Sequence, residues 1–330
     1  MKKLKFDFDI LLPFAIAAFL LLAREILPFN RAFFLQVTMF TVYIMGNNLL
    51  MGYMGYTSFG QPLYLSVGGY AAGLYLAYIG TNPFIAFCLS ILSGLVFGVI
   101  VGPVLIRLRG SYFTLVNAAF CTIGVFTFET LLMGITNGNN GLLLRSRMAS
   151  TPILDLRRPD EFFIFALIVM TIAMLLFRKM DKSALGAIFR ATEKNEQRMK
   201  YLGYNTFNIR WLGFVMAAVL STTAGGLFVV NNGMVSPSLG EQSRAAEVVI
   251  ATLIGGSGSV YGAFFGALAF LGIKEIISQL IGRWELLVGV ITLLVMFWFN
   301  KGIWGSISTL NHSRLKPLIG GLFARKGVQR

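Results

Sequence analysis

The chain has 330 residues, of which 56% are hydrophobic and 13% are charged, and it carries a net charge of +14. Soluble domains are about 45–50% apolar and about 25% charged, so this composition excludes an ordinary soluble globule. Two cysteines and one histidine give no basis for a disulfide framework or a histidine metal site. We interpret the excess of Lys and Arg as the charges that orient a membrane protein, and we expect no nucleic-acid partner.

Apolar segments recur along the chain at lengths that suit a bilayer, where a spanning helix needs about 20 residues. Ten candidates are found, near Ile10–Leu27, Ala32–Tyr53, Leu63–Tyr78, Pro83–Leu105, Tyr112–Ile135, Phe162–Phe177, Trp211–Val230, Ala245–Gly255, Val260–Leu280 and Leu286–Phe299. The first is expected to be retained, because no small-residue cleavage site follows it. The eighth is too short to cross alone, and the glycines at 255–259 predict a broken or re-entrant helix there. The expected fold class is all-α: a polytopic membrane protein with about ten transmembrane or re-entrant helices, forming one domain over residues 1–330.

The distribution of basic residues predicts the orientation of the chain. With the N-terminus inside and ten crossings, 19 of the 28 Lys and Arg residues lie in inside segments. This asymmetry favours a cytoplasmic location for both termini, for the loop at about 181–210 and for the basic tail at about 301–330. Nine crossings would place that tail outside and are disfavoured.

The loop 181–210 is the one long polar segment between strongly apolar ones. Its apolar residues recur three and four positions apart, at Leu185, Ile188, Phe189, Met199 and Leu202. We expect an amphipathic cytoplasmic helix from about Arg190 to Gly203, ended by Gly203 as a left-handed cap. Such a helix can lie on a membrane or dock into the groove of a partner, and the alternative is a solvated connector.

Glycine and proline cluster where the second span gives way to the third, over residues 47–62. Interrupted backbone at membrane depth is tolerated where it is packed in protein or lines a wet cavity, and transporter sites are often built this way. Asn48, Ser58 and Gln61 are the polar groups expected to face such a cavity. The alternative is a plain cytoplasmic turn.

Two further features lie at the other end of the spans. Glu129 is an ionisable residue within the fifth span, which predicts a cavity or a partner, or else a structural hydrogen bond. The run Thr136–Gly141 reads T-N-G-N-N-G, which also suits a solvated turn. The glycines at 255–262 match neither nucleotide-binding fingerprint, and no phosphate-loop lysine occurs, so the chain is not expected to hydrolyse ATP.

Several motifs in a fixed order carry a family resemblance between about Asn48 and Gly272. They are N-L-x-x-G-x-x-G-x-x-S-x-G at 48–60 with Gly68-Gly69-Tyr70, L-R-G-S-Y-F at 108–113, T-N-G-N-N-G-L at 136–142, a loop with Arg190, Ala191, Asn195, Glu196, Leu202, Gly203 and Asn205, and Val235-Ser236-Pro237 with G-G-S-G-S at 255–259. The chain resembles the permease family of branched-chain amino acid ABC transporters, the membrane subunit of leucine/isoleucine/valine uptake. It departs from the family pattern at Arg198 and Met199, where small residues are usual, and at Pro62, where alanine is common.

The resemblance implies a multi-pass permease domain of the bacterial cytoplasmic (inner) membrane, a transport subunit rather than an enzyme and without a cofactor of its own. Its implied partners are a second homologous permease subunit in a heterodimer, two cytoplasmic ATPases that hold ATP and Mg, an extracytoplasmic substrate-binding protein, and membrane lipid. The implied substrate-pathway residues are Asn48, Ser58, Gln61, Gly68, Gly69, Tyr70, Glu129, Thr136, Asn137 and Asn140. The implied ATPase-coupling residues are Arg190, Glu193, Asn195, Glu196 and Gly203.

Three alternatives stay open. Within the ABC class, urea, short amides or a sugar are further possible substrates. A secondary transporter could use Glu129 as a proton carrier. A membrane enzyme is least favoured, because no nucleophile–base pair or metal cluster is evident in the sequence.

Overall fold

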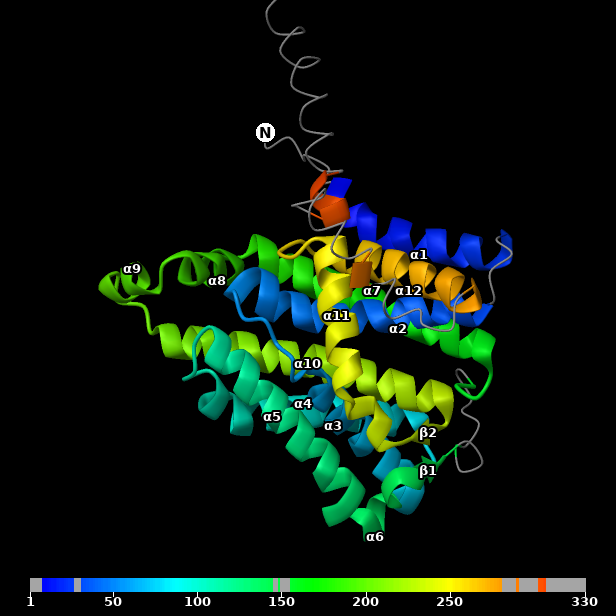
Figure 1. The fold of residues 1–330 in the computed structure, drawn as a ribbon. Coiled ribbons are helices and arrows are strands. Elements are labelled where there is room, and N and C mark those ends of the chain that lie inside the picture. Colours follow the sequence, from blue (N-terminus) through cyan, green and yellow to red (C-terminus); the bar gives the residue numbers. More distant parts are fainter. Residues whose placement is uncertain are drawn as a thin grey trace, which may run out of the picture.

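The computed structural model describes residues 8–26, 31–144, 148, 155–280, 289–290 and 302–306, and helices dominate them (Figure 1). The α-helices are α1 (Phe8–Ile26), α2 (Arg31–Asn48), α3 (Gln61–Leu74), α4 (Pro83–Leu105), α5 (Ser111–Phe126), α6 (Met133–Thr136), α7 (Pro159–Lys182), α8 (Ala184–Lys194), α9 (Glu196–Tyr201), α10 (Thr206–Asn232), α11 (Gln242–Gly255) and α12 (Gly262–Leu280). Three π-helical segments continue α2, α3 and α5, namely η1 (Leu49–Tyr53), η2 (Tyr75–Ile79) and η3 (Thr127–Leu131). Two 3₁₀ turns are η4 (Gly138–Asn140) and η5 (Pro237–Gly240).

Five helical segments of the described chain are long and apolar enough to cross a membrane: Arg31–Tyr53, Pro83–Leu105, Ser111–Leu131, Pro159–Lys182 and Thr206–Asn232. They coincide with the expected second, fourth, fifth, sixth and seventh spans. The expected first, third, eighth and ninth segments are helices α1, α3 with η2, α11 and α12. The expected tenth, Leu286–Phe299, lies outside the described residues except at 289–290, so the total of ten stays a prediction.

Helix α10 is the centre of the packing. It lies against α2, α3 and α4, and 72% of its most apolar 18-residue window is buried. Glycines make the close approach possible: a Cβ on Gly225 would lie 2.0 Å from the carbonyl oxygen of Leu65 in α3. Small residues at helix crossings let backbones pack closely, which is the main source of helix association in lipid.

The predicted interruption between the eighth and ninth segments is present. Helix α11 ends at Gly255, α12 begins at Gly262, and in Figure 1 α11 runs across α2 and α10 rather than alongside them. A Cβ on Gly255 would lie 2.0 Å from the carbonyl oxygen of Gly262, so the chain can reverse this tightly only without a side chain there.

The expectation of an all-α fold needs one small correction. Strands β1 (Leu142–Leu143) and β2 (Met234–Val235) form a short antiparallel pair, with Leu142 opposite Val235 and Leu143 opposite Met234. The pair ties the turn that follows α6 to the end of α10. Backbone groups of both connections thereby find partners, which explains why two such short segments adopt strand geometry.

The expectation of one helix from Arg190 to Gly203 is wrong. The loop forms two helices, α8 and α9, separated at Asn195, whose backbone is extended (φ −156°, ψ 91°). Asn195 is the N-cap of α9, since its side-chain oxygen accepts a hydrogen bond from the backbone N–H of Arg198 at 2.9 Å. An asparagine competes with helical hydrogen bonding and favours caps, which explains the break. Gly203 ends α9 with a φ of +85°, as predicted.

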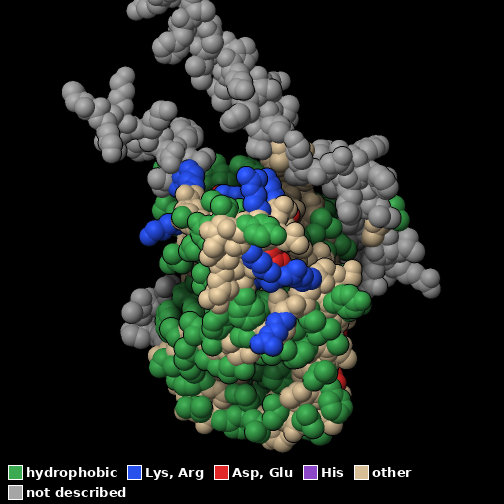
Figure 2. Space-filling model, turned by 90° about the vertical axis from the view of Figure 1, so that its left-hand side faces the viewer, with side chains coloured by type: hydrophobic (Ala, Val, Ile, Leu, Met, Phe, Trp, Pro, Cys, Tyr) green, Lys and Arg blue, Asp and Glu red, His purple; other side chains and the backbone are tan. Residues whose placement is uncertain are grey.

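Both short helices lie at one end of the molecule, on the left in Figure 1. The view onto this end in Figure 2 shows Lys and Arg side chains gathered over it, with few acidic ones between them. The ends of α2, α4 and α7 and the start of α10 meet here. The strands and α6 lie at the opposite end.

Candidate functional site

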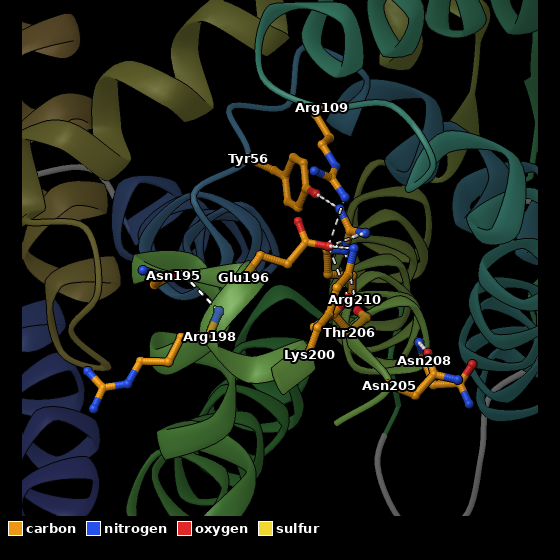
Figure 3. A network of polar contacts seen from close by, with 10 residues as sticks. All are labelled: Tyr56, Arg109, Asn195, Glu196, Arg198, Lys200, Asn205, Thr206, Asn208 and Arg210. Atoms are coloured by element: carbon orange, nitrogen blue, oxygen red, sulfur yellow. Dashed lines mark hydrogen bonds and ion pairs between the residues drawn. The ribbon is translucent and has the colours of Figure 1, made fainter. Parts of the chain in front are cut away.

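The carboxylate of Glu196 anchors the α8–α9 loop to the membrane helices. Its Oε1 accepts a hydrogen bond from Arg109 at 2.9 Å, from Thr206 at 3.0 Å and from Arg210 at 3.1 Å, and it pairs with Lys200 at 3.1 Å. Figure 3 shows these side chains converging on the carboxylate from α9, from the start of α10 and from the connection between α4 and α5. One residue therefore fixes the loop both to α10 and to the connection between α4 and α5.

The network extends from Glu196 toward the interrupted segment. The Arg210 side chain is 9% exposed, and its Nη1 donates to the Tyr56 hydroxyl at 2.7 Å. Burial opposes ionisation of Glu196, but hydrogen bonds from Lys200 and Thr206 and the charges of the two arginines outweigh it and hold the pKa of this carboxyl below its usual range. Glu196 is thus ionised at neutral pH, and a chain of charge-assisted bonds joins α9 to Tyr56.

Helix α8 has a second attachment. Arg190 forms a close ion pair with Asp181, and its guanidinium lies 5.4 Å from the centre of the Tyr53 ring. Phe189 of α8 and Met199 of α9 are buried at 1% and 6% exposure. Of the five apolar residues predicted for this loop, Phe189 and Met199 therefore pack onto the chain itself, whereas Leu185 and Leu202 are exposed.

A different set of side chains on the loop points away from the molecule. Tyr201 is 90% exposed and Leu202 is 65% exposed. Arg198 is also exposed, and in Figure 3 its side chain extends away from the Glu196 network. We call Arg198, Tyr201 and Leu202 the docking face. Two adjoining large apolar side chains beside a cation are a surface that suits a protein partner.

Replacing Glu196 with glutamine tests whether this residue is an internal anchor. Glu196→Gln leaves the buried Arg210 without a counter-charge, so we expect the unfolding free energy to fall by about 2 kcal/mol. Glu193→Gln is the matched control, since Glu193 lies exposed on α8. Thermal unfolding of the purified chain should show a lower midpoint for Glu196→Gln than for Glu193→Gln. Equal midpoints would show that the network does not hold the loop.

The candidate pathway residues Ser58 and Gln61 are fully buried at the start of α3. Ser58 accepts a hydrogen bond from the Asn117 amide at 2.7 Å, and the Asn117 oxygen accepts one from the Tyr64 hydroxyl at 2.7 Å. A Cβ on Gly60 would lie 2.0 Å from the same Asn117 oxygen, so this chain of bonds requires glycine at position 60.

Gln61 connects α3 to α10. Its Oε1 accepts a hydrogen bond from the Ser221 hydroxyl at 2.6 Å, whereas its Nε2 is buried without a partner in the described part of the chain. A buried amide N–H without a partner is costly and needs an explanation, such as a water or a ligand group. Gln61 is thus a donor with spare capacity inside the helix bundle.

Both side-chain polar atoms of Asn48 have partners. Its amide donates to the carbonyl of Ser259 at 2.7 Å and accepts from the N–H of Gly258 at 2.8 Å. Asn48 therefore ties the end of α2 to the glycine-rich turn between α11 and α12. These contacts give Asn48 a structural role, and its expected place in the substrate pathway stays a prediction.

The remaining α3 candidates lie farther along the helix. Tyr70 stacks on Phe128 of η3 at 4.1 Å between ring centres, and its buried hydroxyl has no partner among the described residues. Glu129 follows Phe128 and is half-buried. Gly68 packs on Thr222 of α10, and Gly69 faces Val229 and Leu239. Tyr70 and Glu129 are therefore brought together between α3 and η3.

The turn after α6 is largely self-contained. The Thr136 hydroxyl donates to the carbonyl of Phe128 at 2.6 Å, and the Asn137 amide donates to the carbonyl of Gly141 at 3.0 Å. Asn137 has a φ of +61°, which asparagine tolerates well, and Asn140 is exposed. The turn lies at the end of the molecule opposite the docking face, so the expected pathway residues are spread along the whole bundle.

Helix α5 covers these groups from one side only. Along Ser111–Leu131, 17% of the most apolar window is buried. A stripe of exposed residues follows its outer side, at Leu115, Ala119, Thr122, Phe126 and Thr130. Its inner side carries Asn117 and Phe128. The Thr122 hydroxyl donates to the carbonyl of Ala118 in the same helix, and small residues such as Ala119 and Thr122 on an exposed face allow a neighbouring helix to pack closely.

Sequence reasoning did not find Asn117, Ser221 or Arg210 as members of these networks. Asn117 and Ser221 lie inside long apolar segments and Arg210 ends the polar loop 181–210, so periodicity gave no signal for the contacts they make. Asn117 within a span and Arg210 near the start of another are polar residues that could have been recognised as candidates from the sequence. Among the described residues, no group of three or more His, Cys, Asp and Glu side chains is placed to hold a metal ion.

Comparison with known proteins decides the family. The model of the branched-chain amino acid transport system permease component matches residues 31–298. The chain belongs to this permease family. Its relatives include the high-affinity branched-chain amino acid transport system permease protein LivM of Salmonella typhimurium, 24% identical over 297 residues, which cover 81% of this chain and 68% of the relative. LivM of Escherichia coli is 24% identical over 294 residues with the same coverage.

Other relatives are permeases of a differently named system. The autoinducer 2 import system permease protein LsrC of Yersinia enterocolitica is 32% identical over 173 residues, which cover 50% of this chain and 47% of the relative. No solved structure matches the chain. The expected family is therefore confirmed. Its relatives include permeases named for branched-chain amino acid transport and permeases named for autoinducer 2 import.

Proposed function

We propose that this permease is the membrane subunit of an ABC importer that moves branched-chain amino acids across the bacterial cytoplasmic membrane. The observation that carries the proposal is the family match over residues 31–298, together with the LivM relatives that cover 81% of the chain. In this proposal the α8–α9 end faces the cytoplasm, where partner ATPases hold ATP and Mg. The opposite end receives substrate from an extracytoplasmic binding protein.

The polar groups between α3, α5 and α10 support a pathway along α3. Gln61 and Tyr70 each present a buried donor without a partner among the described residues, and Glu129 adjoins the second of them. The outer stripe of α5 supports a second permease subunit on that side, because the pair would enclose the pathway between them. Movement of α9 would reach this region through Arg210 and Tyr56, which gives ATP binding a route to the interrupted segment.

A second substrate class is favoured by a specific observation. The sequence identity to LsrC is higher than to LivM, 32% against 24%, but it extends over a shorter stretch of the chain. Import of an autoinducer 2 type of substrate by the same ABC mechanism is therefore the main alternative. Urea, short amides and other sugars are less supported. A proton-coupled transporter using Glu129 is the alternative outside the ABC class.

Uptake by the assembled transporter tests the proposal. Cells or vesicles that contain the permease pair, the ATPases and the binding protein should accumulate labelled leucine in the presence of ATP, and an uncoupler should leave this uptake intact. Loss of uptake with the uncoupler while ATP is maintained would instead identify a proton-coupled transporter. Accumulation of autoinducer 2 without leucine would show that the substrate assignment is wrong while the mechanism stands.

A further inference from the structure

A cavity of about 600 Å³ lies at the end of the bundle opposite the docking face, where α1, α2, α7 and α10 meet. Arginines contribute its charge, at positions 24, 31 and 157, and the amides of Gln36, Asn231 and Asn232 add polar groups. Leu35, Leu156, Phe162 and Phe163 form an apolar wall. No carboxylate lines the cavity among the described residues. It is separate from the groups assigned to transport above.

The arginines differ in their surroundings. The Arg24 side chain is 8% exposed, lies 4.7 Å from the centre of the Phe163 ring and forms a close ion pair with Asp160. Its Nε is buried with no partner in the described part of the chain. Arg31, 60% exposed, is 3.7 Å from Asp160 and 3.4 Å from Glu25.

The Arg157 side chain is 49% exposed, and its guanidinium has long contacts to Asp155 at 3.9 Å and to the carbonyl of Met148 at 3.4 Å within the described part of the chain. The carboxylates of Asp160, Glu25 and Asp155 therefore balance part of the charge of the three arginines. Each guanidinium has five N–H donors, so the three cavity-lining arginines have more donors than these contacts use.

The position of the cavity fits the interface between hydrocarbon and water. Helix α1 ends at Ile26 and α10 ends at Asn232, whereas α2 begins at Arg31 and α7 begins at Pro159. The ends of four helices thus meet at this level, and each has an arginine or an asparagine near it, at positions 24, 31, 157, 231 and 232. The N-termini of α2 and α7 add the partial positive charge of their helix dipoles.

We propose that this cavity binds the headgroup of an anionic phospholipid. The phosphate would receive hydrogen bonds from Arg31 and Arg157 above the buried Arg24, and the first part of an acyl chain would lie on Phe162 and Phe163. Arginine forks match phosphate geometry, and basic pockets between membrane helices suit anionic lipid headgroups. The apolar wall favours a lipid over free phosphate or an acidic protein side chain, since neither of these would use it.

Lipid binding to the purified full-length chain tests the proposal. Native mass spectrometry would compare phosphatidylglycerol with phosphatidylcholine of the same acyl chains, and with inorganic phosphate. The wild type should retain phosphatidylglycerol preferentially. The double variant Arg31→Gln, Arg157→Gln should bind it about tenfold more weakly, because each basic contact near a membrane surface contributes a few-fold. Both arginines are exposed, so equal thermal unfolding would confirm that the variant folds.

Arg158→Gln is the matched control. Arg158 neighbours Arg157 but does not line the cavity, so this variant should bind like the wild type. Equal retention of phosphatidylglycerol by the wild type and the double variant, or no preference over phosphatidylcholine, would overturn the proposal. Saturation by inorganic phosphate with no lipid preference would assign a free anion. Unchanged lipid retention with lost docking of the binding protein would assign the cavity to that partner.

Discussion

Replacing Gly68 with alanine is expected to prevent the chain from folding stably, whereas the same change at Gly69 should be tolerated. A Cβ at position 68 would lie 2.2 Å from the carbonyl oxygen of Thr222 and 2.5 Å from its Cα, both backbone atoms of the central helix α10. The backbone cannot yield locally, so α3 and α10 would have to separate. Overpacking of this kind costs about 3 kcal/mol.

Gly69 gives a closely matched control, one residue along the same helix. A Cβ there would meet Val229 Cγ2 at 3.0 Å and Leu239 Cδ1 at 3.1 Å, which are the ends of side chains that can turn aside. Yield after purification and the thermal unfolding midpoint should both fall for Gly68→Ala and stay near wild type for Gly69→Ala. An equal fall of yield and unfolding midpoint in both variants would mean that the close approach of α3 to α10 at Gly68 does not determine stability.

Apolar patterning predicted most of the helices of this fold. Long apolar runs such as Pro83–Leu105 form helices in a membrane, because a helix satisfies the backbone hydrogen bonds within the segment itself. Gly255–Ser259 likewise marked a real break. The strand pair β1–β2 was missed, because two residues on each side give no period to detect. Its formation depends on the tertiary approach of the two connections.

The candidate sites show a sharper limit of sequence reasoning. Glu196 was singled out as a surface contact for a partner, but its carboxylate is engaged inside the chain by Arg109 and Arg210. Those partners lie 87 and 14 residues away in sequence, so no local pattern could reveal the network. Asn195 was assigned to the right loop, but its role as a helix cap could be seen only from the backbone. Sequence located the loop, and the structure shows which of its side chains remain free for a partner.

The second large effect is expected at the docking face. Changing both Tyr201 and Leu202 to aspartate should abolish association with the partner ATPase. Their exposures of 90% and 65% show that neither supports the fold of the permease. Aromatic and apolar anchors at an interface commonly contribute about 2 kcal/mol or more each, and buried aspartates without partners would add a further penalty. Association should therefore weaken by more than about a thousandfold.

Asn208→Asp is the control, since Asn208 is exposed at the same end, near the start of α10, and also gains a negative charge. In Figure 3 its side chain lies apart from the Glu196 network. This variant should associate normally with the ATPase. Normal thermal unfolding of all three proteins would exclude a folding defect as the cause of any loss.

Co-purification of the ATPase with these variants is the measurement that tests the account most directly, because association through α9 requires both the ABC mechanism and a cytoplasmic α8–α9 end. We predict that the ATPase co-purifies with the wild type and with Asn208→Asp, and is absent from the Tyr201→Asp, Leu202→Asp variant. Full recovery of the ATPase with the double variant, together with normal ATP-driven uptake, would contradict the account and leave the α8–α9 loop as a solvated connector.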